Sequence, residues 1–259
     1  ASAVVDAYDS DLTRSTPTAL SEARSVPAAA SVGNYALIAG GFATDGSAVV
    51  DAYDTDLTRS TPTGLSAARY ALAGTSVGNY ALFAGGYTSS YSSVVDAYDT
   101  YLTRSTPTVL SAARAWLAGA HVGDYALFAG GQNSTTNNLT TVDAYYKDLS
   151  HSTPTVLSTA RSWLAGASIA DYAIFAGGVV NEGYSSSTDA YNTSLVRSNP
   201  TDLSVARGYL AGTSVGECAL FAGGNTGSVS AVVDAYTKLL SPTYLPITAG
   251  SKYKLNSDT

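Results

Sequence analysis

Apolar and polar residues alternate along this chain in a pattern that returns every 45 to 47 residues. The tripeptide Asp-Ala-Tyr starts at positions 6, 51, 96, 143, 189 and 234, and a Gly-Gly pair starts at positions 40, 85, 130, 177 and 223. The two markers lie in different parts of the unit and keep the same spacing. A period of this length predicts a modular fold in which each unit packs against its neighbours.

Within each unit the alternation predicts four short strands, which we call a, b, c and d. In the second unit, strand a covers residues 70–77, a Gly78-Asn79 turn follows, and strand b covers residues 80–84 before Gly85-Gly86. Glycine followed by Asn or Asp accepts the positive φ of a two-residue hairpin turn. Strand c covers residues 94–98 and strand d covers residues 102–108.

Strand d is predicted to lie at the outer edge of each sheet, because every clear copy of it contains a proline. Proline has no N–H to donate to a neighbouring strand, so it belongs at an edge, where it also blocks pairing with other molecules. The prolines concerned are Pro17, Pro62, Pro107, Pro154 and Pro200.

A four-stranded antiparallel unit cannot bury both of its faces alone, and the architecture that stacks such units face to face is the β-propeller. Small residues such as Ala73, Gly74, Ala81 and Ala84 let neighbouring sheets approach closely. We therefore expect an all-β fold with four-stranded antiparallel blades. A parallel β-helix is the alternative, but its coils are usually much shorter than this period.

The repeat resembles the kelch family of β-propellers. The residues that carry the resemblance are Arg69 at the start of strand a, Tyr80 in strand b, Gly85-Gly86, and Tyr98-Asp99 at the end of strand c, and it extends over residues 1 to 240. The family usually has a tryptophan in strand d, whereas this chain reads "RSTPT" there. The two tryptophans, Trp116 and Trp163, lie in strand a instead, so the chain resembles a divergent kelch-like group.

The number of blades depends on how the two ends of the chain are used. The a-b hairpin occurs five times and strand c six times, so we expect five blades. Six blades are the alternative, which the kelch resemblance favours, if an a-b hairpin is missing ahead of the N-terminal c-d pair. Either that pair or the C-terminal segment completes the last blade. We assign residues 1–236 to the propeller and 237–259 to a C-terminal strand, a cap or the start of a linker.

The composition of the chain argues against two classes of partner, nucleic acids and the membrane interior. The chain carries 20 acidic against 13 basic residues, for a net charge of −7, and it has no basic stripe of the kind that nucleic acids require. No apolar run approaches the length that membrane insertion needs. The surface is rich in Ser, Thr, Gly and Tyr, which fits a secreted, cell-surface or virion-associated protein.

A repeat places the same residue in every blade, whereas an active site needs different residues at one point. The kelch resemblance suggests a copper-radical oxidase, but His121 falls on an inner strand and His151 on an outer one, so they should not converge. We expect no catalytic set, no metal site and no cofactor. A recurrent arginine precedes strand a, near the channel mouth, and its role is either structural, which we favour, or ligand-binding. These residues are Arg24, Arg69, Arg114, Arg161 and Arg207.

The loops between strands b and c vary freely in length and composition. They offer tyrosine and asparagine side chains, which suit recognition of protein or glycan. The candidate ligand-binding residues are Tyr87, Tyr91, Asn133, Asn137, Asn138, Asn181, Tyr184 and Asn225. The chain is therefore predicted to be a non-catalytic binding or structural module. The alternative is a glycan-active enzyme, sialidase-like or epimerase-like, that uses the arginines of the channel mouth.

Overall fold

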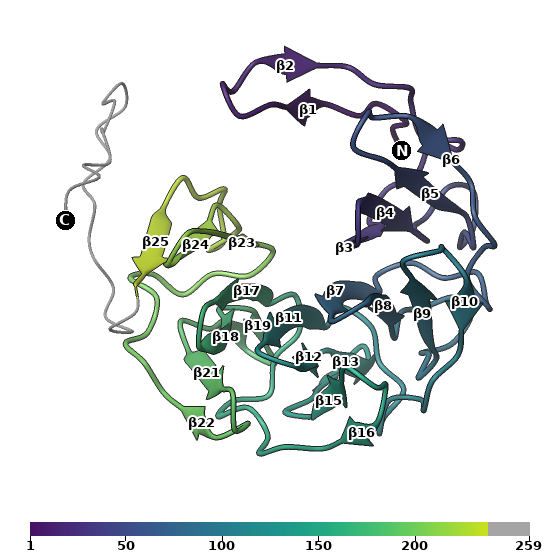
Figure 1. Ribbon diagram of the computed structural model, residues 1–259. Helices are drawn as coiled ribbons and strands as arrows, with labels where there is room; N and C mark the ends of the chain where they lie inside the picture. The colour runs from purple at the N-terminus through teal and green to yellow at the C-terminus, as the bar shows by residue number, and fades with distance from the viewer. Residues whose placement is uncertain (238–259) are drawn as a thin grey trace.

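In the computed structural model, which describes residues 1–237, each unit of the repeat forms one antiparallel sheet, and five such blades follow one another around an axis (Figure 1). The prediction of an all-β propeller is confirmed. Blade 1 contains β3 (Ala28–Val32), β4 (Tyr35–Ala39), β5 (Val50–Tyr53) and β6 (Arg59–Ser60). Blade 2 contains β7 (Ala73–Val77), β8 (Tyr80–Ala84), β9 (Val95–Asp99) and β10 (Arg104–Ser105).

The remaining blades repeat this order. Blade 3 contains β11 (Ala118–Val122), β12 (Tyr125–Ala129), β15 (Val142–Tyr146) and β16 (His151–Ser152). Blade 4 contains β17 (Ala165–Ile169), β18 (Tyr172–Ala176), β21 (Thr188–Asn192) and β22 (Arg197–Ser198). Blade 5 has three strands among the described residues, β23 (Ala211–Val215), β24 (Cys218–Ala222) and β25 (Val233–Tyr236).

The b-c loops were expected to be irregular, and in two blades they are not. Blade 3 carries a small hairpin of β13 (Gln132–Ser134) and β14 (Asn137–Asn138), and blade 4 carries one of β19 (Val179–Val180) and β20 (Gly183–Tyr184). These are the two longest b-c connections. The shorter ones pair with themselves only through a single bridge each, Phe42 with Gly46, Tyr87 with Tyr91 and Asn225 with Val229.

Neighbouring blades bury alternate side chains of their facing sheets. Leu82, Ala84 and Val95 of blade 2 pack in one apolar cluster with Phe128 and Tyr145 of blade 3, and all five are buried. Side chains of a strand point alternately to its two faces, so each blade presents a Leu/Val face to the next blade and a Phe/Tyr face to the previous one.

The inner strands approach one another very closely. A Cβ on Gly119 of β11 would lie 2.6 Å from the carbonyl oxygen of Gly74 in β7, which only glycine avoids. The strand order places strand a at the inner end and strand d at the outer end of each complete blade, as the prolines predicted. Strand d has two residues rather than the predicted seven, and Pro107 lies beyond it.

Strand a begins at Ala73, three residues later than predicted, because the residues before Ala73 do not pair with strand b. Ala71 has a φ of 55°, and Tyr70 pairs with Tyr87 in an isolated bridge instead. The predicted Gly78-Asn79 turn is present, with a φ of 52° at Gly78.

The C-terminal part of the chain, not the N-terminal pair, completes the last hairpin. β25 pairs with β24, whereas β1 (Ala7–Tyr8) and β2 (Arg14–Ser15) form a separate two-stranded sheet beside blade 1 (Figure 1). Apart from Thr237, the segment 237–259 that we assigned to a strand, cap or linker lies outside the described residues.

Candidate functional site

The recurrent arginines lie inside the blades. Each donates from Nη2 to a carbonyl of strand b and forms an ion pair with the aspartate of strand c in the same blade. The five distances are 2.7 Å for Arg24–Asp51, 2.8 Å for Arg69–Asp96, 2.7 Å for Arg114–Asp143, 2.7 Å for Arg161–Asp189 and 2.8 Å for Arg207–Asp234. All five arginine side chains are fully buried, so no guanidinium faces a ligand in the channel mouth.

Burial and pairing shift the pKa values of three of these arginines and of one aspartate in opposite directions. Burial lowers the pKa of Arg69, Arg114 and Arg161, and the adjacent aspartates oppose that shift. Burial would raise the pKa of Asp143, but Arg114, the backbone N–H of Ser111 and His151 outweigh it and lower the pKa below its ordinary value. Each of these arginines therefore already has a charged partner and a carbonyl acceptor within its own blade.

The second residue after each arginine reaches the mouth of the channel. All five such residues have positive φ, at Val26 (44°), Ala71 (55°), Trp116 (55°), Trp163 (53°) and Tyr209 (59°). Backbone hydrogen bonds connect them across blades. The N–H of Trp116 donates to Ala71 at 2.9 Å, that of Trp163 to Trp116 at 2.9 Å, and that of Tyr209 to Trp163 at 3.0 Å. This left-handed conformation is costly for bulky residues, and the inter-blade bonds hold it in place.

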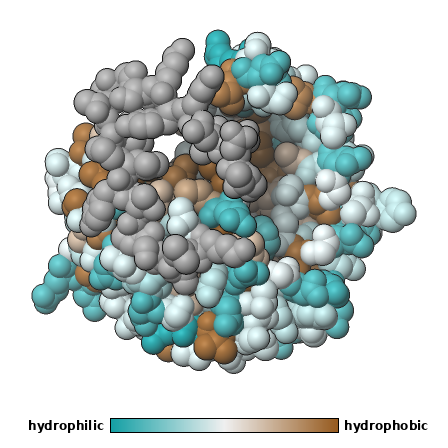
Figure 2. Space-filling model, turned by 60° about the vertical axis from the view of Figure 1, so that its left-hand side comes forward, coloured by the Kyte–Doolittle hydropathy of each residue, from teal (hydrophilic) through white to brown (hydrophobic). Residues whose placement is uncertain are grey.

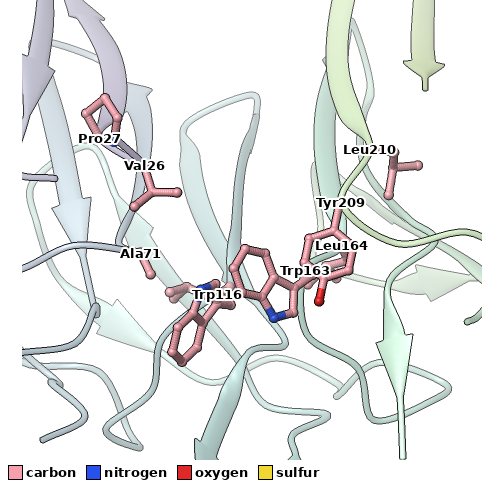
Figure 3. A pocket seen from close by; sticks show the side chains of 9 residues that line it. Val26, Pro27, Ala71, Trp116, Trp163, Leu164, Tyr209 and Leu210 are labelled. Atoms are coloured by element: carbon pink, nitrogen blue, oxygen red, sulfur yellow. The ribbon is translucent and has the colours of Figure 1, made fainter. Parts of the chain in front are cut away.

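These side chains surround a pocket of about 280 Å³ at the centre of the blades (Figure 3). The indole rings of Trp116 and Trp163 lie between Val26 and Ala71 on one side and Tyr209 on the other. The ring centroids of the two indoles are 5.1 Å apart, and that of Tyr209 is 4.5 Å from Trp163. The rest of the lining is Pro27, Leu117, Leu164 and Leu210.

The pocket is uncharged but not wholly apolar. Its lining contains no Asp, Glu, Lys, Arg, His or Cys. Among the described residues, the indole N–H groups of Trp116 and Trp163 and the hydroxyl of Tyr209 have no hydrogen-bond partner. The site therefore combines flat apolar rings with three polar groups that are available to a ligand, and the Tyr209 hydroxyl is the one side-chain group in its lining of a type that can act as an acid, a base or a nucleophile.

Two of the predicted loop residues support the pocket from the b-c loop of blade 2. Tyr87 stacks on Trp116 with centroids 6.0 Å apart, and Tyr91 meets Trp116 at 6.1 Å. Tyr91 also accepts a hydrogen bond from Gln132 Nε2 at 3.1 Å. These contacts fix the orientation of one indole, although neither tyrosine lines the pocket itself.

The other predicted loop residues bind one another. The hydroxyl of Tyr184 donates to Asn225 Oδ1 at 3.0 Å, and Asn138 Nδ2 donates to Asn181 Oδ1 at 3.3 Å, both between adjacent blades. Asn137 Nδ2 donates to Asn133 Oδ1 at 2.6 Å within one loop. The structure does not bring these six residues into the pocket lining.

The two histidines lie apart in separate surroundings. His151 Nε2 is 2.7 Å from Asp143 Oδ1, on the outer strand of blade 3. His121 lies on the inner strand with its side chain exposed, and partial desolvation by the surrounding chain lowers the pKa of its imidazole. Within residues 1–237 no three His, Cys, Asp or Glu side chains gather as a metal site would require.

The aromatic residues that line this pocket were not predicted from the sequence. We expected informative departures from the repeat at the histidines and in the loops, but the second position after the arginine changes from Val26 and Ala71 to Trp116, Trp163 and Tyr209. A comparison of this position across the five units would have revealed the aromatic residues. The prediction used the two tryptophans only to note that they lie in strand a, whereas the kelch family usually has a tryptophan in strand d.

Comparisons with known proteins bear on the fold. No protein-family model matches the sequence, and no curated protein matches it. The solved structure of YjhT is similar with a TM-score of 0.74, over 91% of this chain and 88% of that one, at 14% sequence identity. Similarity at this level of identity shows the shared β-propeller fold. Residues 1–237 contain no helix long and apolar enough to span a bilayer.

Proposed function

We propose that this propeller is a non-catalytic binding module that recognises an uncharged glycan in the pocket of Trp116, Trp163 and Tyr209. The observation that carries the proposal is an aromatic pocket at the channel mouth with unpartnered indole N–H and phenol groups among the described residues. A pyranose ring has an apolar face of C–H groups, which packs on aromatic rings, and an edge of hydroxyl groups, which accept and donate hydrogen bonds. The pocket volume of about 280 Å³ suits one sugar unit.

Three further proposals accompany this one. The variable b-c loops would contact the rest of a longer glycan or its protein carrier, and the chain would belong to a divergent kelch-like group. The hydroxyl-rich composition suits a secreted, cell-surface or virion-associated setting. A glycan-active enzyme is the alternative function. It has less support, because the arginines it would use are each paired with an aspartate inside a blade.

Tryptophan fluorescence tests the proposal directly, because the chain has two tryptophans and both line the pocket. Titration with neutral monosaccharides and oligosaccharides, preceded by a glycan-array screen, should change the emission saturably. Trp163→Ala should weaken binding at least about 30-fold, as expected for a central aromatic contact. Tyr101→Ala is the matched control, since this tyrosine is 88% exposed on a c-d turn outside the pocket, and it should bind as the unchanged protein does.

Two results would contradict the proposal. One is the absence of any saturable ligand among neutral glycans. The other is turnover of a sialyl or uronyl substrate that is lost on Arg114→Ala in a folded variant, which would favour the enzyme.

A further inference from the structure

Among residues 1–237, the Leu/Val face of blade 5 has no neighbour of the kind that covers this face in blades 1 to 4. Val215 is 59% exposed, whereas its counterpart Val77 in blade 2 is 3% exposed. Val233 is 38% exposed, and its counterpart Val95 is fully buried. Figure 2, turned towards this side of the molecule, shows hydrophobic residues within a recess.

At the other end of the chain, β1 and β2 already occupy the outer half of a sixth blade. Leu20 N–H donates to Ala3 O and Arg24 N–H to Ser2 O, at 2.8 and 3.1 Å. The same two bonds connect blades 1 and 2, from Leu65 to Ala48 and from Arg69 to Ser47. The N-terminal pair is therefore attached to blade 1 as each c-d pair is attached to the next blade.

In the described part of the chain, this outer half has no strand b to pair with. β1 has two residues, whereas β9 at the equivalent place in blade 2 has five, because β9 also pairs with β8. Tyr8 is 64% exposed, and its counterpart Tyr98 is fully buried with its hydroxyl donating to Thr63 O. The exposed residues are therefore the counterparts of those that an a-b hairpin covers in the other interfaces, and we call this place the gap.

Two groups beside the gap lack the arginine that their counterparts contact. Asp6 is the counterpart of the five aspartates that each hold a buried arginine, but it is exposed and pairs only with Arg14 of β2, at 2.9 Å, among the described residues. The N–H of Gly86, Gly131 and Gly178 each donates to the carbonyl of the next blade's arginine. Within residues 1–237, the N–H of the equivalent Gly224 has no such acceptor.

We propose that this gap is an interaction site for an arginine-headed β-hairpin with the a-b pattern of this repeat. Its guanidinium pairs with Asp6, its arginine carbonyl accepts from Gly224, and its second strand pairs with β1. Its Phe face covers Val215 and Val233, and its Leu face covers Ile38 of blade 1. The site continues four interfaces that the chain builds within itself, which is why the occupant's chemistry can be specified.

Other occupants fit less well. Residues 238–259 contain no arginine and no Gly-Gly pair, so they do not carry the a-b pattern of the repeat. A second copy of the chain has its five hairpins already paired with their own c strands.

One residue makes the fit looser on the blade 1 side. Ala29 stands in β3 where blades 2 to 5 have glycine, so the inner strand of the hairpin must lie somewhat further from blade 1 than in the other interfaces. Ala29→Gly should therefore strengthen the binding of the hairpin.

The test extends the full chain ahead of Ala1 with a copy of residues 69–90, which joins at the equivalent position of the repeat. The extension should raise Tm by about 5 °C or more. It should also slow amide hydrogen exchange at residues 5–9 and at Gly224 at least tenfold. A matched extension whose arginine is replaced by methionine should lose most of both effects, as should the arginine extension on Asp6→Asn.

Three results would overturn the proposal. The first is an extended chain with unchanged exchange at residues 5–9. The second is concentration-dependent dimerisation of the unextended chain that protects those amides, which would assign the gap to a second copy. The third is existing protection at residues 5–9 that disappears on deletion of 238–259.

Discussion

Each buried arginine connects the segment that precedes strand a to strands b and c of its blade. Arg161 Nη2 donates to Phe175 O of strand b at 3.1 Å and to Asp189 Oδ2 of strand c at 2.7 Å, while Nη1 donates to Ser187 O. Asp189 in turn accepts from the backbone N–H of Ser158, which comes from the preceding linker. Removing one charge leaves the other buried without its partner, which costs more than the pair itself contributes.

Arg161→Met is therefore expected to reduce the free energy of unfolding by about 3–5 kcal/mol. The double variant Arg161→Met/Asp189→Leu should recover part of that loss, because no uncompensated charge remains. Urea denaturation followed by circular dichroism measures both. Arg14→Met is the control, since the Arg14–Asp6 pair is exposed and should contribute no more than about 1 kcal/mol. Equal losses at Arg14 and Arg161 would contradict the argument.

A second residue-scale prediction concerns the glycines of strand a. A Cβ at Gly119 would lie 2.6 Å from the Gly74 carbonyl, and backbone atoms of two sheets cannot move apart cheaply. Gly119→Ala should destabilise the protein by about 1–3 kcal/mol in thermal or urea unfolding. The reverse exchange at the same place in blade 1, Ala29→Gly, should cost about 1 kcal/mol or less, since no inner strand among the described residues precedes it. A larger effect at Ala29 than at Gly119 would refute this account.

At the scale of the strands, the sequence predicted correctly those features that a single local pattern determines. Alternation and the Gly78-Asn79 turn predicted β8 as it stands, and the prolines placed strand d at the edge. The predicted start of β7 was wrong, because Ala71 adopts positive φ and its carbonyl accepts a hydrogen bond from Trp116 N–H of the next blade. The aromatic pocket was missed for the same reason, since its residues come together from five blades and are 45 or more positions apart.

The tyrosines of strand c predict how the blades respond to alkaline pH. Burial raises the pKa of Tyr98, Tyr145 and Tyr191, and that of Tyr236 to about 12, while all four hydroxyls donate to a carbonyl of the preceding linker. A raised pKa in the folded state means that the stability is fully present below the unfolded value near 10 and is lost as pH rises towards the folded value.

The free energy of unfolding should accordingly fall by about 1.4 kcal/mol per pH unit for each of these tyrosines once the pH exceeds about 10. Urea denaturation at several pH values between 8 and 11.5 measures the slope. Tyr191→Phe should lower the stability at pH 8, because it removes the bond to Thr155 O, and should make the fall above pH 10 less steep. A free energy that stays constant up to pH 11.5 would show that these hydroxyls ionise freely in the folded protein.

At the scale of the whole molecule, the blades form a series in which each interior blade is held from both sides. Blade 3 contributes its Phe128 face to one apolar cluster and its Leu127 face to another. Blade 5 contributes to one cluster only among the described residues, through Ala219, Phe221 and Tyr236. In such a series the stability of a unit is the sum of its own contribution and those of its interfaces, so a unit with one covered face opens first.

Native-state hydrogen exchange should reveal this order. The amides of β23 and β24 should exchange at least about tenfold faster than those of β11 and β12, although the hydrogen bonds of the two hairpins have the same register. Deleting residues 1–19 removes β1 and β2, so exchange in β4 and β5 should accelerate, because Tyr53 of β5 loses the hydrogen bond to Thr18 O. Blade 4 should be unaffected and is the internal control. Equal protection of all five hairpins would mean that the two ends of the series are joined in solution, by an occupant of the gap or by each other, and the arginine-headed extension would then add no further protection.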